Sequence, residues 1–115
     1  MRLALAMALL ASPAAAGGAD VIGAEAVRMG AEWRVSATVR HADEGWDHYA
    51  DAFEVVAPDG TVLGTRTLYH PHVEEQPFTR SLTLAIPEGV GTVTVRAKDS
   101  VHGMTGAPFT LELPR

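Results

Sequence analysis

Hydrophobic and polar residues alternate along several stretches of this chain, a spacing typical of β-strands with one buried face. The alternation is clearest over 33–40 and 92–98, and apolar residues of one parity also recur over 78–86 and 109–113. Because successive side chains of a strand point to opposite faces, each stretch predicts a strand between a core and water. Beyond residue 19 the chain has no apolar stripe with helical spacing.

Turn-forming residues separate these stretches. Pro58-Asp59-Gly60 and Pro87-Glu88-Gly89 each lie between two strand-like runs and favour tight turns. Many short strands at regular spacing predict an all-β fold, an antiparallel sandwich of two sheets, with a small barrel as the alternative. We predict seven strands, over 21–29, 32–41, 48–57, 61–69, 78–86, 92–100 and 107–113.

The start of the chain has a different pattern. An apolar run over 3–11 is too short to span a bilayer, and Ala14-Ala15-Ala16 after it fits the A-x-A rule for signal peptidase. A second candidate cut follows Ala19. We therefore predict a signal peptide over 1–19, a single domain over 20–115, and a periplasmic or secreted protein.

Composition excludes several classes of function. The chain has no cysteine, which excludes disulfides, thiolate metal sites and a lipid anchor on cysteine. A formal net charge of −5 at pH 7 argues against nucleic-acid binding, which needs a basic surface. We find no serine-nucleophile, phosphate-loop or His-Glu-x-x-His motif, and no second apolar stretch that could cross a membrane. We therefore expect a protein that is not an enzyme.

One stretch of the chain resembles a known fold family. Residues 92–103, TVTVRAKDSVHG, resemble the penultimate strand and following loop of bacterial immunoglobulin-like and fibronectin-III-like modules. There, alternating Thr and Val lead to Ala-x-Asp and a glycine-bearing turn. More loosely, 41–48 and 70–81 resemble stretches of small exported bacterial proteins. The resemblance implies an immunoglobulin-like or fibronectin-III-like sandwich and implies no activity.

The histidines are the candidate functional residues. Because consecutive antiparallel strands run in opposite directions, the loops at 42–47, 70–77 and 101–106 are expected at one end of the sandwich. Every histidine lies in or beside one of these loops: His41, His48, His70, His72 and His102. A cluster of neutral imidazoles from separate loops is what a transition-metal site needs, so the sequence predicts such a site.

The expected ligands follow from spacing and parity. In an extended segment, positions two apart point the same way, so His70 and His72 can present two imidazoles together. Such a set suits copper, with zinc as second choice, and a thioether from Met104 would favour copper. We expect His70 and His72 as primary ligands, joined by His41 and His102. His48 or Met104 completes the set or exchanges with a member of it, and Asp99 and Asp51 give outer-shell support.

The alternative is a protein-interaction or accessory module that binds no metal. On this interpretation Trp46, Tyr49 and Tyr69, together with the histidines, form a docking surface for a protein partner in the periplasm. The acidic pairs Asp43-Glu44 and Glu74-Glu75 are expected to be solvated in either case.

Overall fold

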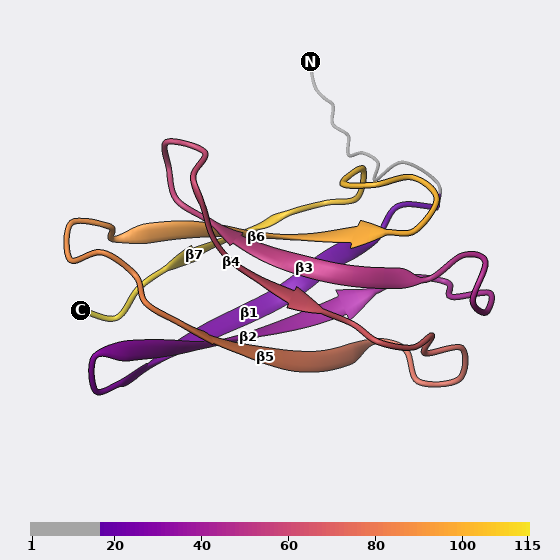
Figure 1. Ribbon diagram of the computed structural model, residues 1–115, viewed down its shortest axis with the longest axis horizontal. Coiled ribbons are helices and arrows are strands. Elements are labelled where there is room, and N and C mark those ends of the chain that lie inside the picture. The colour runs from indigo at the N-terminus through magenta and orange to yellow at the C-terminus, as the bar shows by residue number, and fades with distance from the viewer. Residues whose placement is uncertain (1–16) are drawn as a thin grey trace, which may run out of the picture.

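The computed structural model describes residues 17–115, which form seven antiparallel strands in two sheets and no helix (Figure 1). Each predicted strand is present, with ends that differ by a few residues from those expected. The strands are β1 (Asp20–Met29), β2 (Glu32–Arg40), β3 (Ala50–Val56), β4 (Val62–Thr67), β5 (Phe78–Leu84), β6 (Thr92–Asp99) and β7 (Phe109–Glu112).

The strands divide into a three-stranded and a four-stranded sheet. The first has the order β1-β2-β5 and the second the order β4-β3-β6-β7, and every pairing is antiparallel. Figure 1 shows the two sheets as layers, with β2 central in one and β3 and β6 central in the other. The all-β, two-sheet expectation is therefore confirmed.

The core lies between the two sheets, where the alternating residues meet. Strand β2 buries one residue in two from Trp33 to Val39, and β6 buries Val93, Val95 and Ala97 in the same way. Phe53 of β3 is fully buried among them. Since the chain has no disulfide, burial of this apolar surface is what stabilises the two layers against each other.

The loops that carry the histidines lie at one end of the molecule. The segments 41–49, 68–77 and 100–108 connect β2 to β3, β4 to β5 and β6 to β7, and all three lie on the right in Figure 1. The tight turns at 57–61 and 87–91 lie at the opposite end. The up-and-down topology expected from the sequence thus brings the histidine-bearing loops together.

The described fold begins before the predicted domain boundary at residue 20. Ala19 is fully buried in the core, and the Asp20 carboxylate accepts a 2.8 Å hydrogen bond from the Ala107 amide. Residues 1–16, most of the predicted signal peptide, lie outside the described residues. Within 17–115, no helix is long and apolar enough to cross a membrane.

Candidate metal centre

The centre of the histidine cluster is the carboxylate of Asp99, the last residue of β6. Its side chain is fully buried, because Asp99 has the same parity as the core residues of β6. One oxygen, Oδ1, accepts the backbone N–H groups of Val101 and His102 and so fixes the turn that follows the strand. The other oxygen, Oδ2, is left to face the imidazoles.

His41, directly after β2, contacts this carboxylate from the other sheet. Its Nε2 lies 2.9 Å from Asp99 Oδ2 and 2.8 Å from the carbonyl oxygen of Gly17. Its Nδ1 lies 2.6 Å from Oδ1 of Asp43. The imidazole is almost completely buried, and each of its nitrogens contacts a carboxylate oxygen in place of water.

His48, in the loop before β3, repeats this arrangement. Its Nε2 lies 2.8 Å from Asp99 Oδ2, and its Nδ1 lies 2.7 Å from Glu44 Oε1. The rings of His41 and His48 meet edge to face, with centroids 4.8 Å apart. In both imidazoles, therefore, Nε2 points toward Asp99 Oδ2, and Nδ1 contacts a second carboxylate, Asp43 or Glu44.

His102 completes the group from the loop after β6. Its Nδ1 lies 2.9 Å from Asp99 Oδ2, and its ring centroid lies 4.9 Å from that of His48. Ligand atoms of His41, His48 and Asp99 all lie within 4.8 Å of one another, close enough to hold one metal ion. We call His41, His48, Asp99 and His102 the Asp99 cluster.

The electrostatics of the cluster follow from these contacts. Burial opposes ionisation of Asp99, but hydrogen bonds from His102, His48 and His41 outweigh it and hold the pKa of this carboxyl well below its ordinary value. Hydrogen bonds to Glu44 first, and then to Asp99, raise the pKa of His48. A buried negative charge therefore faces the point on which the imidazoles converge.

Asp43 was expected to be solvated, and that expectation is wrong. Its side chain is fully buried: Oδ1 holds His41 and accepts the amide of Ala50 at 3.0 Å, while Oδ2 accepts the amide of His72 at 2.7 Å. Asp43 therefore ties the loop at 41–49 to the loop at 68–77. Its parity with His41 in an extended segment was the only sequence signal for this role.

The His70 and His72 side chains, which the sequence placed first among the ligands, do not join the Asp99 cluster. The His72 ring stacks on Phe78 with centroids 3.9 Å apart, and its Nε2 lies 3.0 Å from Arg80 Nη2. Burial first, and then the charge of Arg80, lower the pKa of His72. His70 is exposed, with its ring 4.8 Å from that of His72.

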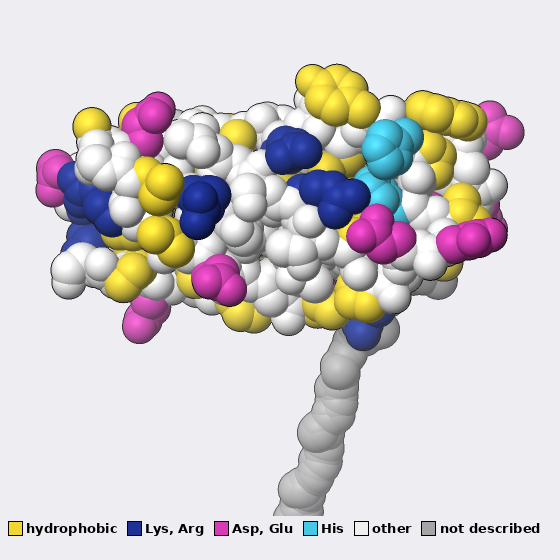
Figure 2. All heavy atoms as spheres, turned by 90° about the horizontal axis from the view of Figure 1, so that it is seen from below, with side chains coloured by type: hydrophobic (Ala, Val, Ile, Leu, Met, Phe, Trp, Pro, Cys, Tyr) yellow, Lys and Arg dark blue, Asp and Glu magenta, His cyan; other side chains and the backbone are white. Residues whose placement is uncertain are grey.

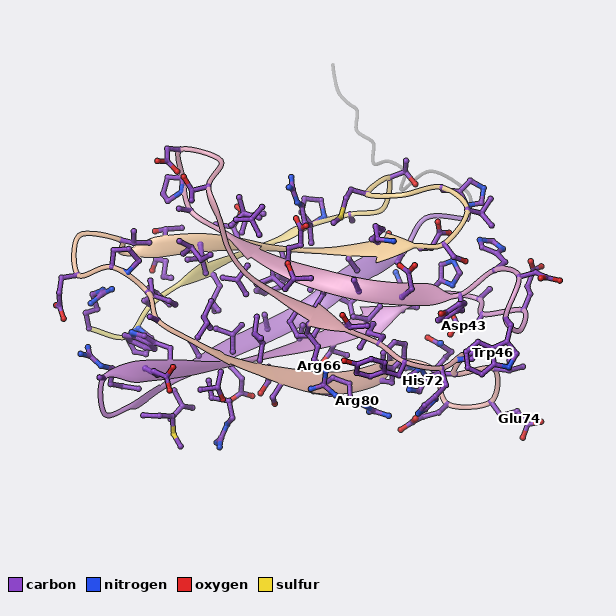
Figure 3. The ribbon with its side chains drawn as sticks, in the orientation of Figure 1. Asp43, Trp46, Arg66, His72, Glu74 and Arg80 are labelled. Carbon is purple, nitrogen blue, oxygen red and sulfur yellow. The ribbon has the colours of Figure 1, made fainter. Side chains whose placement is uncertain are left out.

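Figure 3 shows the position of His72, beside Arg80 and on the side of the loop that faces Asp43. Figure 2 shows histidine, basic and acidic side chains gathered near this end of the molecule. Two histidine groups therefore share one end: the Asp99 cluster and the pair His70–His72, linked through the Asp43 carboxylate.

Asp51 and Met104 are the two remaining residues of the predicted site. Asp51 pairs with Lys98, whose Nζ lies 2.8 Å from its Oδ2, and none of its described hydrogen bonds or ion pairs reaches a histidine. The outer-shell carboxylates in the structure are instead Asp43 and Glu44. Met104 is half-buried in the loop after β6, and its role as a ligand stays a prediction.

Comparison with known proteins gives one distant similarity. The chain is 43% identical over 77 residues to a protein of Halomicrobium mukohataei named "Putative lipoprotein". The match includes 67% of this chain but only 38% of the length of that relative. No protein-family model matches the chain, and no solved structure matches it.

Proposed function

We propose that this protein binds one transition-metal ion at the Asp99 cluster. The observation that carries the proposal is the convergence of His41 Nε2, His48 Nε2 and His102 Nδ1 on one carboxylate oxygen, at 2.8 to 2.9 Å. Three imidazoles and a carboxylate are a common donor set for transition metals. They come from the two loops at 41–49 and 100–108 and from the end of β6, which the sheets hold in place, so little ordering is needed on binding.

The number of protons that the His41 and His48 rings can carry supports a cation beside Asp99 Oδ2. Both nitrogens of His41 face carboxylate oxygens, and so do both nitrogens of His48. A neutral imidazole has only one N–H, so without a cation each ring must hold an extra proton there. A metal ion on Nε2 replaces that proton, while Nδ1–H donates to Asp43 or Glu44 and orients the ring.

Copper is the metal that we propose, with zinc as the alternative. Nitrogen-rich sites favour Cu(II) over the other divalent first-row ions, and a thioether from Met104 in the loop after His102 would also serve Cu(I). The role is carriage, buffering or delivery of the ion, without catalysis.

Export and fold type belong to the same proposal. An apolar leader with Ala14-Ala15-Ala16 supports export, as does the similarity to a protein whose name calls it a lipoprotein. The strand order supports a fibronectin-III-like sandwich: β1, β2 and β5 correspond to strands A, B and E, and β3, β6 and β7 to C, F and G. Strand β4 pairs with β3 instead of joining the β1 sheet.

A second candidate function rests on exposed aromatic residues near the same end. Trp46 is 67% exposed and Tyr69 is 76% exposed, and Trp46 packs edge to face on Tyr49. Exposed aromatic side chains beside polar groups are typical of protein interfaces. On this alternative the protein is a periplasmic interaction module, and the buried imidazoles only stabilise its loops.

Metal titration tests the proposal. The exported protein, freed of metal with a chelator, is titrated calorimetrically with Cu(II) and with Zn(II), beside the variants His48→Ala and His70→Ala. We expect one equivalent of copper to bind to the parent and to His70→Ala, and much weaker binding to His48→Ala. Failure of the folded parent to bind either metal at micromolar concentration would overturn the proposal and favour the interaction module.

A further inference from the structure

The backbone of Gly17 lies in direct contact with the Asp99 cluster. Its carbonyl oxygen accepts the Nε2–H of His41 at 2.8 Å. A Cβ atom on Gly17 would overlap the His102 ring and lie 2.9 Å from each of its nitrogens. Only a residue without a side chain therefore fits, and its φ of 90° also favours glycine. The α-nitrogen is bonded to this same Cα, at about 1.5 Å, so it belongs to the residue that contacts both His41 and His102.

The two residues that follow fasten Gly17 to the fold. A Cβ atom on Gly18 would lie 2.7 Å from the backbone nitrogen of Gly106, so these two segments pass each other closely. Ala19 is fully buried in the core. A leader cut after Ala19 would remove a core residue and the carbonyl that His41 contacts. A cut after Ala16 would leave both in place.

We propose that a signal peptidase cuts the chain between Ala16 and Gly17, and that the α-amine released on Gly17 is a further ligand of the metal. In the cut, water adds across the peptide bond: its hydroxyl completes the Ala16 carboxyl, and its hydrogen passes to the Gly17 nitrogen. The proposal rests on the metal-binding function argued above. It means that removal of the leader completes the site.

The chemistry of the nitrogen explains why the cut matters. The lone pair of a peptide nitrogen is delocalised into the carbonyl, so an uncut chain offers no neutral donor at this position. A free amine offers a lone pair once it has lost its proton, which the metal displaces. The amine and carbonyl oxygen of one residue can bind one ion in a five-membered ring. The Gly17 carbonyl already lies beside His41.

The resulting donor set favours Cu(II). Three imidazole nitrogens and one amine nitrogen, with Asp99 as an anionic oxygen, match the tetragonal nitrogen and oxygen coordination of that ion. The amine would therefore tighten Cu(II) binding more than Zn(II) binding, because zinc in tetrahedral sites already has enough donors in the Asp99 cluster.

The test begins with protein exported from the full-length gene, whose N-terminus is read by intact mass and by sequencing. We expect Gly17. The chain has a single lysine, Lys98, so the variant Lys98→Arg leaves the α-amine as the only acylable amine and keeps a cation beside Asp51. This variant is titrated with Cu(II) before and after acetylation. Equal unfolding midpoints of the two metal-free forms confirm that acetylation leaves the fold intact.

We expect acetylation to weaken Cu(II) binding by at least the roughly 10- to 100-fold that loss of a supporting group costs a metal site. A second measurement uses protein labelled with ¹⁵N-glycine. Its Cu(II) electron–nuclear double resonance spectrum should show a directly coordinated ¹⁵N nucleus, because the imidazole nitrogens keep ¹⁴N.

The possible failures are distinguishable. Equal copper affinity with and without acetylation, or no coordinated ¹⁵N, would overturn the amine ligand and leave the Asp99 cluster as the site. A mature chain that begins at Asp20 would also overturn it. Absence of copper binding in every form would overturn the proposed function together with this inference.

Discussion

The Nε2 atom of His41 lies 2.9 Å from the Oδ2 atom of Asp99, although 58 positions separate the two residues. His41 follows the central strand of one sheet, and Asp99 ends a central strand of the other. The contact therefore joins the two layers at their common end. Because both side chains are buried there, water screens the interaction between them little.

Asp99→Asn tests how far this carboxylate controls the site. An amide keeps one oxygen for the loop N–H groups but removes the negative charge that faces His41 and His48. We expect copper affinity to fall by about 10- to 100-fold. The pKa of His48 should also fall, because the Asp99 carboxylate helps to raise it. Calorimetry and NMR titration of the His48 ring protons measure the two effects.

The matched control is Asp51→Asn, which removes a carboxylate that pairs with Lys98. It should change neither copper affinity nor the pKa of His48. A similar loss of affinity in both variants would mean that overall charge, and not contact with the imidazoles, governs binding.

Asp43→Asn tests the link between the two histidine groups. The Asp43 oxygens accept from His41, from the amide of Ala50 and from the amide of His72. An asparagine has one acceptor oxygen, so its NH₂ group must face at least one of these donors. We expect a loss of about 1–3 kcal/mol in the free energy of unfolding, measured with urea, because a buried donor is left unpaired.

The same variant should bind copper less tightly, since the His41 ring no longer donates to a charged carboxylate. Glu74→Gln is the control, because Glu74 is an exposed carboxylate of the neighbouring loop (Figure 3). If Asp43→Asn and Glu74→Gln had the same free energy of unfolding, the Asp43 carboxylate would not stabilise the contact between the two loops.

The sequence predicted the strands well because the alternation is local. Each core residue of β2 and β6 is separated from the next by one exposed or half-buried residue, and this pattern appears directly in the chain. Topology then followed from the alternation of strand direction, which places the loops at 41–49, 68–77 and 100–108 at one end.

The composition of the site was harder to predict, because parity is a weaker guide to side-chain direction once a strand has ended. His70 and His72 share a segment, but His72 is buried because its ring stacks on Phe78, the first residue of β5, a contact that spacing does not show. Asp43 stands in an acidic pair that is typical of a solvated loop, but its carboxylate accepts hydrogen bonds from His41 in the same loop and from the amides of Ala50 and His72 in other segments. Such convergence is a property of three-dimensional packing.

The edge of the sandwich between β4 and β5 provides a test of that packing. A Cβ atom on Gly64 would lie 3.0 Å from a methyl carbon of Leu82 and from one of Leu84. We expect Gly64→Ala to lower the free energy of unfolding by about 1 kcal/mol, because added volume displaces both leucines. Gly23→Ala is the control, since the nearest atom to its added carbon is 4.0 Å away in Thr38.

Two histidines give the metal-free protein opposite responses to pH. The folded-state pKa of His48 is raised, so its contribution to stability is present below about pH 6.5 and is lost as pH rises through the folded value. The folded-state pKa of His72 is lowered, so its contribution is present above about pH 6.5 and is lost as pH falls toward the folded value.

The two variants His48→Gln and His72→Gln should therefore flatten different parts of the stability curve. In chelator, the free energy of unfolding of His48→Gln should change less than that of the parent above about pH 6.5, and that of His72→Gln should change less below it. Urea unfolding at intervals from about pH 5 to 8, which spans the ordinary range of histidine, measures both curves. His70→Gln is the matched control, because its imidazole is exposed. If it altered the curve as much as the other two, burial and hydrogen bonding of His48 and His72 would not be the cause of the pH dependence.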